Sequence, residues 1–117
     1  MRWLVLLCIS SSSLLAQGDS SIRFSDSVET HIVAVNKLLL AADKQIGVPY
    51  AYGGCSPKGF DCSGFIKYCY QTSLNRTIPH RSVEISQMGT SVSRQDAIPC
   101  DIVTFTGRSI NGKVGHV

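Results

Sequence analysis

The sequence predicts one small domain of the α+β class, with helices first and strands last. Residues 28–46 and 62–72 carry apolar side chains at the three- and four-residue spacing of a helix. Residues 102–106 and 113–117 are short extended runs on either side of a glycine-containing turn segment. Because helices and strands do not alternate, we expect a small antiparallel sheet rather than βαβ units. A length of 117 residues leaves room for a single domain.

The composition is that of a globular protein. Hydrophobic residues make up 44% of the chain and charged residues 16%, which excludes low-complexity and disordered classes. The 11 basic and 8 acidic residues give a net charge of +3. The basic residues form no stripe interleaved with aromatics, so we expect no nucleic-acid partner.

The first 16 residues have the pattern of a secretory signal peptide. Arg2 supplies the positive start, residues 3–9 are apolar, and small residues lead to Ala16. The alternative is a membrane anchor, but the apolar run is too short to span a bilayer. Cys8 follows Leu7 rather than a small residue, which argues against lipid modification. We therefore expect export to the periplasm or the extracellular space, with no stable membrane insertion after signal removal.

A leader and a first helix are expected next. Residues 17–27 are polar and serine-rich, which predicts a mobile leader ahead of a domain over residues 28–117. Asp26 with Glu29 predicts a helix start, and Gly47 predicts its end. The apolar face of this helix is expected to comprise Ile32, Val35, Leu39, Ala42 and Ile46.

The remaining elements follow from shorter signals. Residues 48–59 are rich in glycine and proline, which predicts an irregular loop. In the helix at 62–72, the apolar positions include Cys69, which we expect to be a core thiol. A short helix is expected at 81–88, with its cap near Pro79 or Ser82, and a hairpin turn at 107–112.

Cys62 is the candidate nucleophile. It opens the second predicted helix after Asp61, a good N-cap residue, and after a glycine-rich approach. Helix N-termini favour the thiolate, and the amide of Cys62 itself could donate to an oxyanion. The alternative is a buried structural cysteine, but polar Asp61 and Ser63 flank it.

Three histidines are candidates for the base. His31 is expected on the solvated side of the first helix, and His80 lies in a loop after Pro79. His116 lies in an apolar extended segment, where an imidazole without a partner would be costly to bury. We therefore favour His116 as the partner of a cysteine nucleophile.

The four cysteines after the signal leave three arrangements open. These residues are Cys55, Cys62, Cys69 and Cys100. Two disulfides would consume the nucleophile. A zinc site would need closer ligand pairs than these. In the third arrangement, which compartment and spacing favour, Cys62 is free and Cys69 is buried, and a link between Cys55 and Cys100 is left open. We expect no metal site and no cofactor.

Five ordered blocks resemble the NlpC-type cell-wall cysteine peptidases, from about residue 38 to the end. The blocks are Pro49-Tyr50 with Gly53-Gly54, Asp61-Cys62-Ser63-Gly64, Pro79-His80-Arg81-Ser82, Cys100-Asp101-Ile102-Val103 and Gly115-His116-Val117. The Asp-Cys-Ser-Gly block alone would be a weak signal, but the ordered set is specific.

The resemblance implies a minimal papain-like α+β fold that cleaves peptidoglycan stem peptides, usually between γ-D-glutamate and the following diamino acid. Its positions imply Cys62 as nucleophile, His116 as general base and Tyr50 as the residue that orients the carbonyl or oxyanion. The substrate-binding residues that it implies are Asp61, Ser63 and Ser82, with His80 and Arg81 beside them.

Three features of the sequence depart from the family pattern. His80 stands where the family usually has arginine, and Cys100 stands where glycine is common, which calls for a tolerated backbone geometry or a disulfide. The chain also stops one residue after His116, before the strand that would carry a third residue to orient the imidazole. We therefore expect a fragment that lacks C-terminal strands. The alternative is a natural short form with reduced activity.

Two other function classes remain open at this point. One is a wall-peptide-binding module with an impaired active site. The other is a structural domain held by disulfides. Both depend on the state of Cys62, which a peptidase needs as a free thiol.

Overall fold

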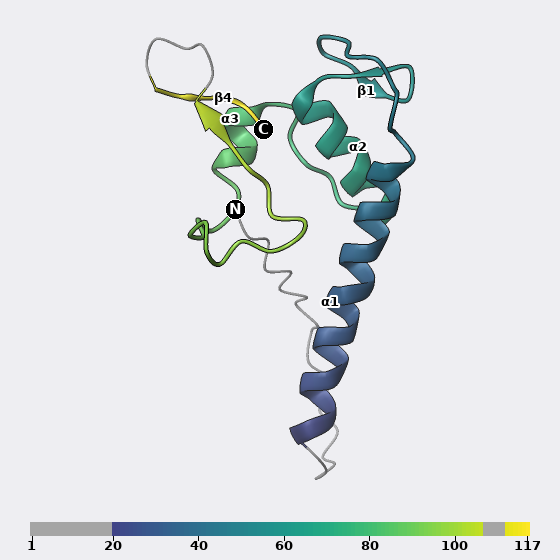
Figure 1. Cartoon of the computed structure of the whole chain (residues 1–117), viewed down its shortest axis with the longest axis vertical. Coiled ribbons are helices and arrows are strands. Elements are labelled where there is room, and N and C mark those ends of the chain that lie inside the picture. Colours follow the sequence, from purple (N-terminus) through teal and green to yellow (C-terminus); the bar gives the residue numbers. More distant parts are fainter. Residues whose placement is uncertain (1–19, 107–111) are drawn as a thin grey trace.

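The computed structural model describes residues 20–106 and 112–117, with side chains from residue 27 onward. Its elements in chain order are α1 (Ser20–Asp43), β1 (Cys55–Ser56), β2 (Gly59–Phe60), α2 (Cys62–Leu74), α3 (Ser82–Ser86), β3 (Phe105–Thr106) and β4 (Val114–His116). The strands form two separate antiparallel pairs, β1 with β2 and β3 with β4 (Figure 1). The predicted α+β class is confirmed.

The first helix starts earlier than expected. It begins at Ser20, so Asp26 and Glu29 lie within α1, and most of the expected leader at 17–27 is helical. The helix start that we expected near residues 26–28 was therefore wrong. Residues 20–27 contain no glycine or proline that would stop a helix, so the helix continues through this polar segment. At the other end, Gly47 takes a φ of +89° in the turn that follows α1.

The buried face of α1 is only partly the expected one. Leu38 is buried, and Val35 and Ala42 are half-buried beside it. Ile32, Leu39 and Ile46, which we expected to be buried, are 52%, 48% and 81% exposed. The prediction was wrong there because α1 contacts α2 along a stripe through Leu38, and the pattern alone cannot choose between neighbouring apolar stripes.

The core lies between α1, α2 and the segments that follow α2. Its buried members are Leu38, Cys69, Tyr70, Ile78, Ile85 and Ile102. Cys69 is 3% exposed, which confirms it as a core thiol, and burial raises its pKa to about 11. In Figure 1, α2 lies beside the C-terminal end of α1, while the N-terminal turns of α1 extend beyond the other described elements.

The loop expected at 48–59 contains a small hairpin instead. Cys55 pairs with Phe60 and Ser56 with Gly59, and Tyr50 forms an isolated parallel bridge with Phe60. Two-residue strands are too short to show a period of two, so no strand pattern is visible in this part of the sequence. The hairpin leads directly into Asp61 and α2, and therefore shapes the approach to Cys62.

The later elements follow the prediction with shorter bounds. The helix expected at 81–88 covers Ser82–Ser86, and its N-cap is Arg81, which makes no side-chain cap bond. The two expected strands pair through Phe105 and His116, with an irregular register after Phe105. Most of the hairpin turn expected at 107–112 lies outside the described residues.

Candidate active site

Cys62 is the first residue of α2, and Asp61 caps that helix as predicted. Asp61 has an extended backbone, and its Oδ1 accepts the Gly64 N–H at 2.7 Å. The first amides of a helix have no intrahelical acceptor, so this bond stabilises the turn that carries the thiol.

The carboxylate of Asp61 also holds two other segments. Its Oδ2 accepts the Gly53 N–H at 3.0 Å, and its Oδ1 lies 3.1 Å from His80 Nε2 and 3.3 Å from Ser63 Oγ. Burial by itself raises the pKa of Asp61, but hydrogen bonds from Gly64, His80 and Gly53 outweigh it and leave the pKa below its ordinary value of 3.8. Asp61 is therefore an anionic hub, by which we mean that its carboxylate is hydrogen-bonded to the loop, to the helix start and to residue 80 at once.

The thiol of Cys62 is half-buried and free. Its hydrogen-bond partner is Ser82, with 3.6 Å between Sγ and Oγ. Ser63 is buried, at 4% exposed, and its hydroxyl donates to the backbone carbonyl of His80 at 3.1 Å. Three successive residues at the start of α2 thus contact residues 80–82.

Close backbone approach at this point depends on Gly64. A Cβ there would overlap the carbonyl oxygen of Gly54 and would come within 2.8 Å of His80 Nε2. Gly54 is equally crowded, against the backbone of Gly59. From the sequence we placed Gly54 in an irregular loop and assigned Gly64 no packing role, so this close approach was missed. The pairing of His80 with Asp61 was missed as well, because residues 19 positions apart give no local signal.

The side chains of the other predicted site residues are exposed. The ring of His116 is exposed on β4, with its centroid 5.7 Å from that of Phe105. The side chain of Tyr50 is 71% exposed, and Arg81 pairs with Glu84 at 3.5 Å on the surface. Among the described residues, none of these three is hydrogen-bonded to Cys62.

All four described cysteines are free thiols, so neither the two-disulfide arrangement nor a link between Cys55 and Cys100 is present. Cys100 adopts a φ of +75°, the left-handed conformation that glycine takes most easily. Its thiol lies 3.7 Å from the carbonyl oxygen of Val35. The departure from the family glycine is thus accommodated by the backbone and not by a disulfide. Across residues 20–106 and 112–117, no three His, Cys, Asp or Glu side chains group as metal ligands would.

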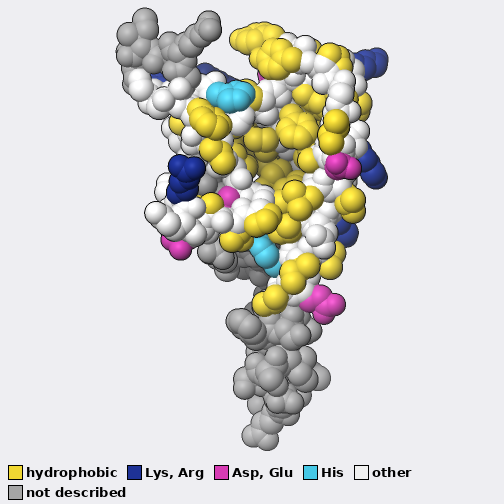
Figure 2. Space-filling view, viewed as in Figure 1, with side chains coloured by type: hydrophobic (Ala, Val, Ile, Leu, Met, Phe, Trp, Pro, Cys, Tyr) yellow, Lys and Arg dark blue, Asp and Glu magenta, His cyan; other side chains and the backbone are white. Residues whose placement is uncertain are grey.

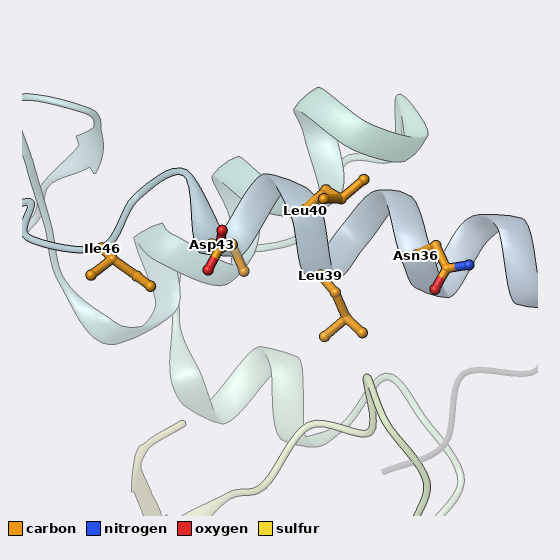
Figure 3. A pocket seen from close by; sticks show the side chains of 6 residues that line it. Asn36, Leu39, Leu40, Asp43 and Ile46 are labelled. Carbon is orange, nitrogen blue, oxygen red and sulfur yellow. The ribbon is translucent and has the colours of Figure 1, made fainter.

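The surface has hollows that are mainly apolar. A hollow of about 750 Å³ lies along the C-terminal half of α1 and is lined mainly by apolar side chains, with Asn36 and Asp43 (Figure 3). It contains no nucleophile. Figure 2 shows a second concave area, apolar at its floor, between β3–β4 and α2. The Cys62 cluster, and not the α1 hollow, combines a thiol with ordered polar partners.

Comparison with known proteins identifies the family of the chain. The family model described as NlpC/P60 matches residues 47–117, which include Tyr50, Cys62, Ser82 and His116. The chain belongs to the NlpC/P60 family. The NlpC/P60 domain of the peptidoglycan hydrolase SagA has a similar structure, with a TM-score of 0.61 and 34% identity over 70% of this chain and 68% of that one.

Curated relatives give the same family assignment. The probable endopeptidase NlpC of Escherichia coli K12 is 34% identical over 91 residues, which cover 77% of this chain and 56% of that protein. The gamma-DL-glutamyl hydrolase of Bacillus subtilis is 41% identical over 66 residues, 56% of this chain and 16% of that protein. The chain therefore spans only part of the length of these relatives. In the described part of the chain, no helix has both the length and the hydropathy to cross a membrane.

Proposed function

We propose that this NlpC/P60 chain is an exported cysteine endopeptidase that hydrolyses peptidoglycan stem peptides. The observation that carries the proposal is the free, half-buried thiol of Cys62 on the first turn of a helix capped by Asp61. This environment suits a nucleophile better than a structural cysteine, as the buried Cys69 on the same helix illustrates. Relatives named as an endopeptidase and as a gamma-DL-glutamyl hydrolase support this substrate class.

The first chemical step is attack of the Cys62 thiolate on the amide carbonyl between γ-D-glutamate and the diamino acid. The carbonyl carbon gains a bond to sulfur, and the oxygen becomes an oxyanion. The amide of Cys62, which has no intrahelical acceptor, is the proposed donor to that oxygen, and Tyr50 is the proposed second orienting group. The proton of the Cys62 thiol passes to His116, and His116 gives that proton to the departing amine when the C–N bond breaks.

The second step is hydrolysis of the resulting thioester. His116 takes a proton from water as the water attacks the carbonyl carbon, and Cys62 leaves as the thiolate. In the described structure the His116 ring lies beside that of Phe105, on a strand that contacts α3, the helix that begins at Ser82. Ser63, His80, Arg81 and Ser82 are proposed to border the stem peptide.

The experiment that tests this function compares Cys62→Ser with Cys55→Ser on synthetic stem peptides. Cys55 is the matched control because it is a free, exposed thiol seven positions before Cys62. We expect Cys62→Ser to lower kcat/KM by at least about 10³-fold and Cys55→Ser to leave it unchanged. Peptides containing diaminopimelate and lysine are assayed side by side, which identifies the diamino acid. Retained cleavage by Cys62→Ser would refute the proposed mechanism.

A second candidate is a module that binds wall peptides without cutting them. The observation that favours it is the partner of Cys62, which is Ser82 and not His116. Such a module would bind stem peptides in a calorimeter, with similar affinity for the wild type and Cys62→Ser, and release no product. Turnover that depends on Cys62 would exclude it.

The proposed location rests on the first 16 residues, which lie outside the described structure. A signal peptide there would deliver the enzyme to the cell wall. The N-terminal sequence of the mature protein tests this directly, since we expect cleavage near Ala16 and Gln17.

A further inference from the structure

Three contacts join the start of α2 to the segment just before α3. Asp61 meets the His80 ring at 3.1 Å, Ser63 donates to the His80 carbonyl at 3.1 Å, and Cys62 meets Ser82 at 3.6 Å. We call this set the clamp. Each of three successive residues on one side is matched by a partner on the other, so residues 80–82 are held in a fixed register on the nucleophile's turn.

His80 makes two of these contacts, one from its ring and one from its backbone. An ionised carboxylate only accepts hydrogen bonds, so Nε2 of His80 is the donor to Asp61. The ring is 28% exposed and the carboxylate 14%, so solvent reaches this pair poorly. The neighbouring Arg81 makes no such contact, because it pairs with Glu84 and is 77% exposed. The ring of His80 is thus the side-chain link that fixes this segment.

We infer that His80 is a positioning residue for the Cys62 site, which holds Ser82 Oγ against the thiol by fastening residues 80–82 to Asp61. The inference rests on the proposed function for its catalytic meaning, but the contacts themselves do not. Ser82 can donate its hydroxyl proton to the Cys62 sulfur, and a hydrogen bond to a thiolate favours that charged form. Asp61 then acts through His80 and Ser82, in addition to capping the helix.

Two substitutions of His80, by amide side chains of different length, test its hydrogen bond to Asp61. Glutamine places an N–H donor at the same distance from the backbone as Nε2, so we expect His80→Gln to keep the clamp. Asparagine is one methylene shorter and cannot reach Asp61 from the same backbone position. His31→Asn is the matched control, because His31 is an exposed histidine on α1.

The readout is the rate at which iodoacetamide alkylates each cysteine near neutral pH. Trypsin cuts after Lys58, Lys67 and Arg76, which places Cys55, Cys62 and Cys69 on separate peptides for mass spectrometry. We expect His80→Asn and Ser82→Ala each to slow the labelling of Cys62 by about fivefold, the effect of one hydrogen bond. His80→Gln and His31→Asn should stay within about twofold of the wild type.

A double variant decides whether His80 acts through Ser82. Once Ser82 is alanine, the clamp has no hydroxyl to hold, so we expect adding His80→Asn to slow labelling no further. If labelling of Cys62 in the double variant is slowed by the product of the two single effects, the inference is overturned. Equal rates for His80→Asn and the wild type would also overturn it, as would a His80→Gln rate as slow as that of His80→Asn.

Two controls separate this inference from unfolding and from the proposed function. Cys69 is buried and should remain unlabelled in every folded variant, so its labelling marks unfolding. If His80→Asn unfolds, His80→Leu replaces it, because leucine fills space at residue 80 without a donor for Asp61. Labelling of Cys62 about fivefold slower in His80→Leu than in His80→Gln supports the clamp, and equal rates overturn it. If the labelling pattern holds but no stem peptide is cleaved, the proposed function fails and the clamp stands. If Cys62-dependent cleavage occurs and labelling is indifferent to residue 80, the clamp fails and the function stands.

Discussion

The start of α2 and the β3–β4 hairpin carry the two proposed catalytic residues, but they are built very differently. Around Cys62, the Asp61 carboxylate has partners in the loop, in the helix and at residue 80, and Ser63 and Gly64 are buried. Around His116, the strands are two and three residues long. Phe105 is 52% exposed there, and His116 is exposed beside it.

The nucleophile thus lies among buried and hydrogen-bonded neighbours, whereas the base lies on a short strand that pairs with β3 and contacts α3, with its own side chain exposed. Substitutions near Cys62 should therefore change both stability and activity. Substitutions on the hairpin should change activity with little effect on stability, because few buried contacts are lost there.

The largest expected effect comes from His116→Ala. We expect kcat/KM on stem peptides to fall by about 10³-fold, or about 4 kcal/mol of transition-state stabilisation, because the general base and acid is lost. The free energy of unfolding in urea should change by less than about 0.5 kcal/mol, since the side chain is exposed. His31→Ala, on the exposed side of α1, serves as the control. A strongly destabilised His116→Ala would show that the hairpin is as firmly held as the start of α2.

A glycine pair tests the same contrast through the backbone. Gly64→Ala should destabilise the chain by about 3 kcal/mol, because its Cβ would overlap the Gly54 carbonyl and crowd His80. Gly112→Ala, at the base of the hairpin, meets no atom within 4 Å but must adopt a φ of +64°, which costs about 1 kcal/mol. Urea unfolding of both variants gives the comparison. Equal losses would contradict the tighter packing assigned to the Cys62 side.

The sequence predicted those parts of this site that depend on neighbours along the chain. Asp61 as the N-cap of a helix beginning at Cys62 follows from residue type and position, and the structure confirms it. Cys69 as a core thiol follows from its place on the apolar side of that helix. Both predictions concern interactions within one helix, where periodicity and capping determine the outcome.

The parts that the sequence did not predict depend on how distant segments meet. The contacts of His80 with Asp61 and of Ser82 with Cys62 join residues 19 and 20 positions apart. The choice of Leu38 over Leu39 as the buried residue of α1 depends on where α2 packs. Neither follows from local pattern. Several neighbouring apolar stripes could be buried and several polar residues could pair, and only the tertiary packing decides which of them do.

The smallest expected effect is the loss of unfolding free energy when acid protonates the Asp61 carboxylate. Its pKa is below 3.8 in the folded chain, so its stabilising effect is complete at neutral pH, weakens below about pH 4 and is lost once the folded-state carboxyl is protonated. Asparagine caps a helix about as well as aspartate but does not titrate. Between pH 5 and pH 3, we therefore expect the wild type to lose about 1 kcal/mol more unfolding free energy than Asp61→Asn, of the order of one cap hydrogen bond. Phe105→Ala, on the hairpin, should follow the wild-type pH dependence, since it leaves Asp61 intact. Parallel acid curves for Asp61→Asn and the wild type would mean that Asp61 is not the anionic hub of the Cys62 site.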